Sequence, residues 1–218
     1  MNKIKCTDLF DIKTDYLLPL FSCTYPWEIL PKISDYILEL LKNPPSDFSL
    51  LCDGVLVGKG VEIDKDATII PPAVIGHGTK IRKGAFLRGN VITGCDCVIG
   101  NSSEIKNSVL LNNVQVPHYN YVGDSILGNF SHMGAGSILS NLKLGGKYVI
   151  IHADIDYETN LRKVGAFLGD GADIGCNCVL NPGTIVGKGA RIYPLNSVRG
   201  TIPCDTIVKS KSDIISKR

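Results

Sequence analysis

A histidine, two basic residues and a glutamate are the side chains of this sequence that could combine acid–base chemistry with anion binding. His118 lies in the stretch PHYNY, and an imidazole ordinarily titrates close to neutral pH, so it can accept a proton there. Arg88 and Lys106 lie upstream of it, and Glu104 precedes the lysine by two residues. Paired cations suit a phosphate dianion. These residue types indicate a general base near an anion site.

The element that must position these side chains is a repeat with a period of six. This period fits neither an α-helix nor a β-strand, and it is typical of a parallel β-helix, in which three short units make one coil. Coils stack at about 4.8 Å. The inward position is aliphatic at every place but one: Val57, Ile63, Ile69, Ile75, Ile81, Leu87, Thr93, Ile99, Ile105 and Leu111. The position two residues earlier is small or β-branched: Ala73, Thr79, Ala85, Val91, Cys97, Ser103 and Val109.

One coil of the repeat separates Arg88 from Lys106, because they are eighteen residues apart. The two cations should therefore lie one above the other on the same face. Like charges stacked at a strand spacing repel unless an anion or a carboxylate lies between them. Two hypotheses follow, a bound anion or an intramolecular salt bridge with Glu104, and the anion site is the preferred one.

Two interruptions of the repeat are expected to leave the prism as loops, since a stacked coil can absorb extra residues only in that way. The step from Leu111 to Leu127 is sixteen, four more than two units, which predicts a loop that carries PHYNY and His118. The step from Leu139 to Leu168 is twenty-nine, which predicts an inserted loop over residues 142–165. A long excursion of this kind is typical of a lid or a subunit contact.

The fold class predicted is all-β, a left-handed parallel β-helix of hexapeptide repeats with a short N-terminal helical arm. The arm spans 1–50, where PWEILPKISDYILELLKN has helical spacing and should cover one end of the prism. The β-helix spans 51–205, and 206–218 is expected to be a solvated tail. The paired cysteines at 95–97 and 176–178 are C-x-C rather than zinc spacing, so they are interpreted as small filler residues and no metal is predicted.

Composition narrows the partners. The formal net charge is +2, which gives no indication of a nucleic-acid or membrane surface. No apolar run approaches the length of a membrane span, and no signal peptide is evident, so a cytoplasmic protein is expected. A solenoid exposes long flat faces that stacking of three prisms would bury, and this predicts a homotrimer.

The stretch PHYNYVGDSILGNFSHMGAGSILSN resembles the left-handed β-helix acetyltransferases. The closest resemblance is to the C-terminal domain of the bacterial bifunctional enzyme that acetylates glucosamine 1-phosphate and then makes UDP-N-acetylglucosamine. An arginine and a glutamate-x-lysine also precede the histidine at the family's spacing. The resemblance covers about residues 55–200 and excludes the arm. The matching residues are Arg88, Glu104, Lys106, His118, Tyr121, Gly123-Asp124, Gly134-Ala135-Gly136 and Asn141.

The resemblance implies a role for each matching side chain in acetyl transfer from acetyl-CoA, a co-substrate, to an amino-sugar phosphate. His118 would be the general base. Arg88 and Lys106 would bind the sugar phosphate, with Glu104 contacting the sugar or orienting the lysine. The remaining implied contacts are Tyr121 to the phosphate or sugar, His132 to the sugar phosphate, Asn141 to the sugar or the acetyl end of coenzyme A, and Cys176, in the last coils, to the wall of the coenzyme A groove.

Departures from the family pattern leave alternatives open. His132 replaces an asparagine and Leu142 replaces a tyrosine. The alternatives are a same-fold transferase with another amino-sugar or nucleotide-sugar acceptor, and a non-catalytic trimerising or sensing subunit of a separate sugar nucleotidyltransferase. A zinc-dependent β-helix enzyme needs histidine spacing that this sequence lacks. The uridylyltransferase half of the bifunctional enzyme is missing, because no L-x-x-G-x-G-T-R motif occurs.

Overall fold

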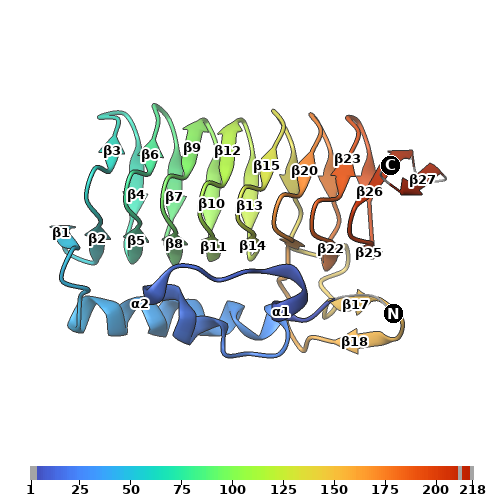
Figure 1. Ribbon diagram of the computed structural model, residues 1–218, viewed down its shortest axis with the longest axis horizontal. Coiled ribbons are helices and arrows are strands. Elements are labelled where there is room, and N and C mark those ends of the chain that lie inside the picture. Colours follow the sequence, from blue (N-terminus) through green and yellow to red (C-terminus); the bar gives the residue numbers. More distant parts are fainter. Residues whose placement is uncertain (1–3, 211–212, 217–218) are drawn as a thin grey trace.

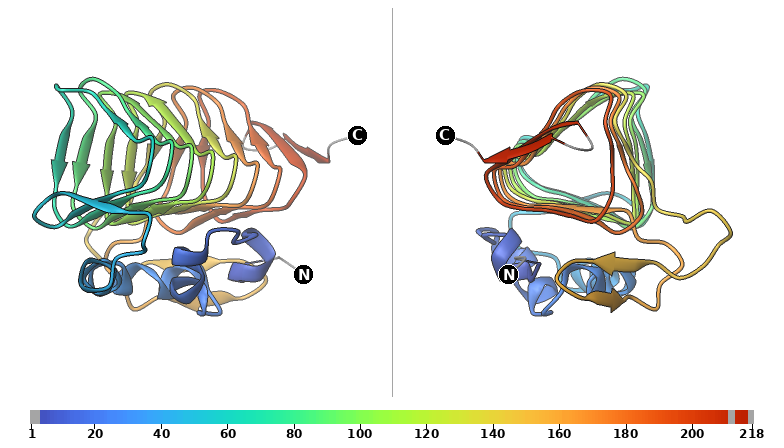
Figure 2. Two further views of the ribbon diagram at one scale, coloured as in Figure 1. Left: turned by 60° about the vertical axis from the view of Figure 1, so that its left-hand side comes forward. Right: turned by 90° about the vertical axis from the view of Figure 1, so that its right-hand side faces the viewer.

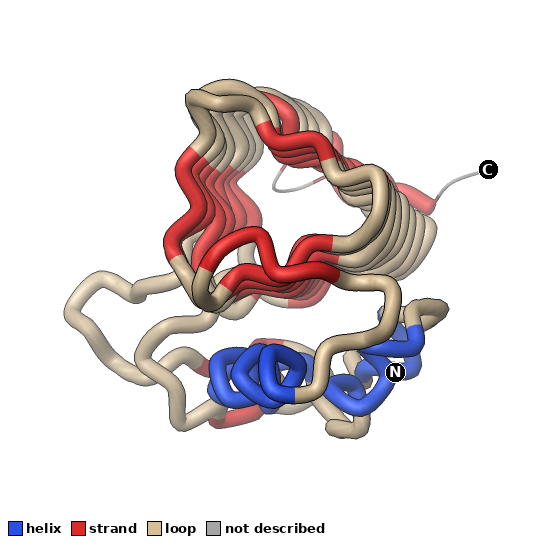
Figure 3. The backbone as a smooth tube through the Cα atoms, turned by 90° about the vertical axis from the view of Figure 1, so that its left-hand side faces the viewer, coloured by secondary structure: helices blue, strands red, loops and turns tan. Residues whose placement is uncertain are grey.

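The structure is a three-sided prism of stacked coils with helices along one side (Figures 1 and 2). It is a computed structural model that describes residues 4–210 and 213–216. The three sides are parallel β-sheets, except where a single antiparallel strand ends a sheet. The predicted all-β parallel β-helix is therefore confirmed, and Figure 3 shows the triangular cross-section along the stack. No helix among the described residues is long and apolar enough to cross a membrane.

The strands of each sheet come from successive coils. Sheet A contains β1 (Ser49–Cys52), β2 (Val55–Val57), β5 (Ala73–Ile75), β8 (Val91–Thr93), β11 (Ser108–Leu110), β14 (Ile126–Leu127), β19 (Ala166–Leu168), β22 (Thr184–Val186) and β25 (Thr201–Ile202). Sheet B contains β3 (Glu62–Ile63), β6 (Lys80–Ile81), β9 (Val98–Asn101), β12 (Gln115–His118), β15 (His132–Met133), β20 (Asp173–Ile174), β23 (Arg191–Ile192), β26 (Thr206–Ser210) and β27 (Asp213–Ser216). Sheet C contains β4 (Thr68–Ile70), β7 (Phe86–Arg88), β10 (Glu104–Lys106), β13 (Tyr121–Gly123), β16 (Ile138–Leu139), β21 (Val179–Leu180) and β24 (Ser197–Val198).

The repeat residues fill the inside of the prism as predicted. Ile75, Leu87, Ile105 and Met133 are fully buried in one apolar column with the small residues of the repeat. Cys97 belongs to that column, and burial raises the pKa of its thiol to about 12. It packs as a small apolar side chain, in agreement with its interpretation as filler.

The length of a coil changes along the stack. Phe86 pairs with Glu104, eighteen residues later, whereas Glu104 pairs with Tyr121, seventeen residues later. The residue is lost at the corner between sheets C and A, where Asn107 alone connects β10 to β11 and Asp124 alone connects β13 to β14. The inward residue is consequently Leu110, not the predicted Leu111.

The N-terminal arm covers sheet A, not the end of the prism as predicted. It consists of α1 (Cys6–Leu9), the 3-10 turns η1 (Asp15–Phe21), η2 (Pro26–Glu28) and η3 (Leu30–Lys32), and α2 (Ile33–Lys42). Ile33 and Ile37 of α2 and Trp27 form a second apolar core with outward residues of sheet A, among them Ile92 and Phe167. Sheet A needs this cover because both of its surfaces are apolar.

Polar contacts fix the arm at the corners of sheet A. The carboxylate of Asp170 accepts hydrogen bonds from the backbone N–H of Asp11 at 2.8 Å and of Asn129 at 2.7 Å. On the same corner, Thr14 Oγ1 donates to Asn112 Oδ1 at 2.8 Å. The arm is thus a fixed part of the fold.

Residues 142–165 leave the prism between β16 and β19. They include the antiparallel hairpin of β17 (Ile150–His152) and β18 (Asp156–Glu158), which lies beside the arm below sheet A (Figure 1). Val149 and Ile151 are fully buried in the same apolar core as the arm helices. The excursion therefore shares the work of covering sheet A.

The end of the chain differs from the expected solvated tail. Residues 206–210 form β26, which pairs with β23 and buries Thr206 and Val208. β27 pairs antiparallel with β26. The expected tail at 211–212 and 217–218 lies outside the described residues.

Substitution of Trp27 by alanine should destabilise the protein strongly. The indole is 5% exposed and stacks on Tyr25 with a centroid distance of 4.6 Å, so its removal opens a cavity. We expect a loss of about 3–5 kcal/mol in the free energy of unfolding, measured with urea. Leu144→Ala is the control, because that side chain is fully exposed and its removal should cost less than about 0.5 kcal/mol. Equal losses in the two variants would contradict the packing described.

Candidate functional site

Sheet C brings most of the sequence-predicted residues together. Glu104 pairs with Tyr121 in register, and Lys106 pairs with Gly123. The register of β7 and β10 places Arg88 next to Lys106, as their spacing predicted. Arg88, Lys106 and Gly123 therefore form one row at the edge of sheet C that adjoins sheet A, while Glu104 and Tyr121 form a second row nearer sheet B.

Both cations of this row already have carboxylate partners. Arg88 Nη1 lies 2.6 Å from Glu104 Oε1, and Lys106 Nζ lies 3.6 Å from Asp124 Oδ2. The salt bridge with Glu104, one of the two hypotheses left open by the sequence, is thus present in this structure. The Arg88 side chain is 45% exposed, so an incoming anion can reach it.

Tyr121 crosses the sheet toward the cation row. A Cβ built on Gly123 would come within 2.6 Å of the Tyr121 Oη atom and 2.7 Å of Asn141 Nδ2, so the phenol occupies the space that a side chain at 123 would need. Asn141 Nδ2 donates to that phenol at 3.2 Å. Burial raises the pKa of the Tyr121 phenol, and the carboxylate of Glu104 adds to the rise. The group therefore stays protonated near neutrality and can donate a hydrogen bond.

His118 ends β12 at the corner between sheets B and C. It pairs with Asn101 one coil earlier, so it is part of the regular stack, and the prediction of a loop that leaves the prism is wrong. The four apparent extra residues arise because two units have five residues each. Asn120 holds this corner: its Oδ1 accepts the His118 N–H at 3.0 Å, and its Nδ2 donates to the carbonyl of Gly134. Among the described residues no side chain pairs with the His118 imidazole, which is exposed.

The structure separates two of the predicted residues from this group. His132 lies on sheet B next to Gln115, and its Nδ1 is 3.0 Å from Asp173 Oδ1. Cys176 is an exposed free thiol at the same corner as His118, two coils further along. Neither contacts the residues of sheet C within one chain.

Sequence reasoning missed three residues that hold the site. Asp124 binds Lys106 and Asn141, Asn120 fixes the corner of His118, and Gly123 gives room for the phenol. The sequence did contain a signal for Asp124, since one of the two shortened units of the repeat ends there. No comparable signal marks Asn120.

The arrangement is able to bind an anion and remove a proton on one face. Two cations and the phenol of Tyr121 lie toward the corner with sheet A, and a free imidazole lies at the opposite corner, with sheet C between them. Among the described residues no cluster of three or more histidine, cysteine or acidic side chains could hold a metal ion.

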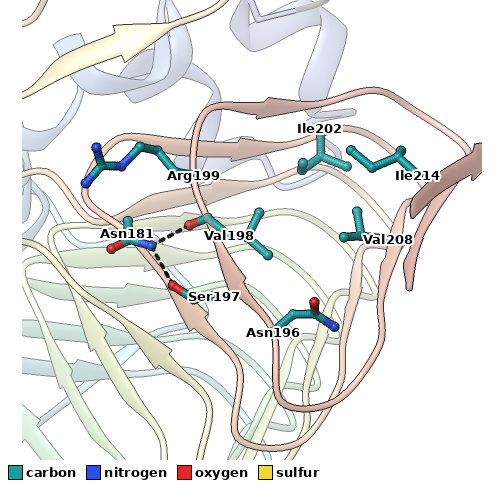
Figure 4. Close-up of a pocket in the computed structure, with 8 residues that line it drawn as sticks. All are labelled: Asn181, Asn196, Ser197, Val198, Arg199, Ile202, Val208 and Ile214. Atoms are coloured by element: carbon teal, nitrogen blue, oxygen red, sulfur yellow. Dashed lines mark hydrogen bonds between the residues drawn. The ribbon is translucent and has the colours of Figure 1, made fainter. Parts of the chain in front are cut away.

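A cavity of about 500 Å³ lies further along the stack, at the last coils (Figure 4). Asn181 Nδ2 donates to Ser197 Oγ at 3.1 Å and to the carbonyl of Val198 at 2.8 Å on its wall. Ile202 and Ile214 contribute apolar side chains to the lining. This cavity lies in the region that the sequence assigned to the coenzyme A groove.

Comparison with known proteins agrees with this geometry. Residues 69–161 match the family model described as GMPPB C-terminal domain. The Bifunctional protein GlmU of Methanococcus aeolicus is 32% identical over 199 residues, which cover 88% of this chain and 47% of the relative. The Bifunctional sugar-1-phosphate nucleotidylyltransferase/acetyltransferase of Sulfurisphaera tokodaii is 35% identical over 141 residues, which cover 64% of this chain and 35% of that one.

A solved structure of AntD, an N-acyltransferase from Bacillus cereus in complex with dTDP and coenzyme A, is 17% identical with a TM-score of 0.46. The alignment covers 79% of this chain and 90% of that one, and the likeness is too remote to bear on the reaction. The chain spans about half the length of the curated relatives it matches. It resembles the hexapeptide-repeat acetyltransferases. Within them, it resembles the C-terminal domain of GlmU.

Gly123→Ala should disturb the site without unfolding the prism. The new methyl group would overlap the Tyr121 Oη atom and the Asn141 amide, both of which are ends of side chains that can swing away. We expect new NMR resonances for the Tyr121 ring and the Asn141 amide, with a melting temperature close to that of the native chain. Unchanged resonances would show that the phenol does not lie over Gly123.

Proposed function

We propose that this chain is an acetyl-CoA-dependent N-acetyltransferase whose acceptor is an amino-sugar phosphate, glucosamine 1-phosphate first. The observation that carries the proposal is the placement of Arg88 and Lys106 in adjacent positions on sheet C, with the unpaired imidazole of His118 at its far corner. The names of the GlmU relatives and of the nucleotidylyltransferase/acetyltransferase relative support the type of reaction.

Acceptor binding would begin with an exchange of partners. The phosphate replaces Glu104 on the Arg88 guanidinium and takes a second contact from Lys106, because a dianion attracts both cations more strongly than one carboxylate does. The phenol of Tyr121 donates a further hydrogen bond. Glu104, once released, is free to contact a hydroxyl of the sugar.

Acetyl transfer would then proceed by direct attack. The sugar amine attacks the thioester carbon, the new C–N bond forms, and His118 accepts the amine proton. Backbone N–H groups stabilise the oxyanion, the C–S bond breaks, and the thiolate of coenzyme A leaves and is protonated. No cysteine nucleophile takes part.

A different acceptor is the second candidate. The family's asparagine is His132 here, and its Nδ1 faces Asp173 on sheet B rather than the cation row on sheet C. An acceptor such as another amino sugar or a nucleotide sugar would use the same base and a different set of polar contacts.

We also propose that the protein is a homotrimer. The arm and the hairpin of β17 and β18 cover sheet A, so only sheets B and C remain for contact with other copies. Packing sheet B of one copy against sheet C of the next would enclose the otherwise flat site and bring His132 of one chain toward the cations of another.

His118→Ala should lower turnover by about 100-fold or more, because a general base contributes that much to proton transfer. The measurement is thiol release from acetyl-CoA with glucosamine 1-phosphate. His152→Ala is the matched control, since His152 is also exposed but lies on the hairpin, where its Nδ1 is 2.8 Å from Asp156. Equal activity in the two variants would remove the base role of His118. No turnover in any variant would favour another acceptor or a non-catalytic subunit.

Arg88→Ala should separate phosphate binding from chemistry. The loss of one cation should raise the KM for glucosamine 1-phosphate by about 10-fold or more, because a charge-assisted bond contributes about 1.5–3 kcal/mol. The KM for acetyl-CoA should stay the same, as should kcat/KM for glucosamine, which carries no phosphate. A similar loss with both sugars would indicate that Arg88 does not bind the phosphate.

A further inference from the structure

The single buried carboxylate of Asp124 lies where the site, the arm and the inserted hairpin meet. We infer that Asp124 is a positioning residue for Lys106 and Asn141, and that Asn107 links it to the N-terminal arm, so that docking of the arm sets the geometry of the site. This inference rests on the function proposed above, in which Lys106 and Asn141 touch the substrates.

Asp124 has three polar partners and almost no contact with solvent. Its Oδ1 accepts Asn107 Nδ2 at 2.8 Å, and its Oδ2 accepts Asn141 Nδ2 at 2.5 Å and lies 3.6 Å from Lys106 Nζ. The Asp124 side chain is 7% exposed, and that of Lys106 is 22% exposed. A buried carboxylate must have such partners to be tolerated, so its charge holds the lysine and the amide in fixed positions.

The inserted segment joins at the same residue. The Gly165 N–H donates to the carbonyl of Asp124 at 2.7 Å, and the Val164 N–H donates to the carbonyl of Asn141 at 2.9 Å. The segment therefore leaves the prism at Asn141 and returns beside Asp124. Both ends of the excursion are fixed to the pair that holds the site.

The arm reaches Asp124 through Asn107. The same Nδ2 group that binds the carboxylate donates to the carbonyl of Leu30 at 3.5 Å, one hydrogen for each acceptor. Leu30 is buried and directly precedes α2, which packs on sheet A. A shift of the arm would move the amide of Asn107 and, with it, the carboxylate.

The backbone is shaped to make this contact. Asn107 and Asp124 are the two one-residue corners of the stack, and both have positive φ, 45° and 49°. The preceding coil crosses the same corner with two residues, Gly89 and Asn90. Since a longer corner fits the prism equally well, the shortened corners are not required by the fold, and they stack the amide of one on the carboxylate of the other.

Asp124→Asn is the direct test, because it keeps the shape and suits a positive φ. Asn107 and Asn141 both present N–H groups, and an amide has one oxygen to accept them, so at least one bond is lost and a donor faces a donor. We expect kcat with glucosamine 1-phosphate to fall by about 10-fold or more. The KM of the phosphorylated sugar should not rise in parallel, since removing a negative charge beside Lys106 favours an anion.

Asn107→Gly tests the link to the arm and keeps the positive φ. It should lower kcat in the same way but less strongly. Thr14→Val is the matched control: it removes the arm's bond to Asn112 at the opposite corner of sheet A and should leave kcat and KM unchanged. Losses in the Asp124 and Asn107 variants no larger than in the control would overturn the inference while the proposed function stands.

Lysine labelling gives a readout that needs no activity. Brief acetylation with an activated ester, followed by mass spectrometry, measures the reactivity of Lys106 against Lys80, which pairs with Glu62 on sheet B and serves as the internal reference. Labelling of Lys106 should rise several-fold in the Asp124 and Asn107 variants and stay constant in the Thr14 variant. Constant labelling in all three would overturn the inference, whether or not the native chain acetylates any sugar.

Discussion

Stacking of one coil on the next is the constraint from which the rest of this structure follows. Each short strand hydrogen-bonds to the strand one coil earlier, so residues one coil apart must lie at a strand spacing on the same face. This brings Arg88 beside Lys106 and Glu104 beside Tyr121 although they are far apart in sequence. The flat face that results is rigid, and its side chains hold their relative positions without help from a flexible loop.

The corners of the prism connect this face to the rest of the molecule. A coil shortened by one residue places Asn107 and Asp124 in direct contact, and the same corner receives the arm through Leu30 and the inserted segment through Gly165. Sheet A is apolar on both surfaces and depends on those two elements for cover. The parts that complete the hydrophobic core are thus the parts that touch the residues behind the site.

The sequence predicted the repeat, the arm helix and the row of Arg88 and Lys106, because each depends on spacing alone. It failed where spacing is ambiguous. Leu110 and Leu111 are both leucine, so a slip of one residue was hidden and appeared later as extra residues around His118. Which face His132 would occupy, and which carboxylate would bind Lys106, depend on corner geometry and side-chain direction. The period of six carries no information on either.

A structure of the protein with glucosamine 1-phosphate and coenzyme A tests the central claim most directly, namely that sheet C is the acetyl-transfer face. The account predicts that the phosphate lies between Arg88 and Lys106, that Arg88 has left Glu104, and that the sugar amine points toward His118. A phosphate bound elsewhere, with Arg88 still paired to Glu104, would contradict it.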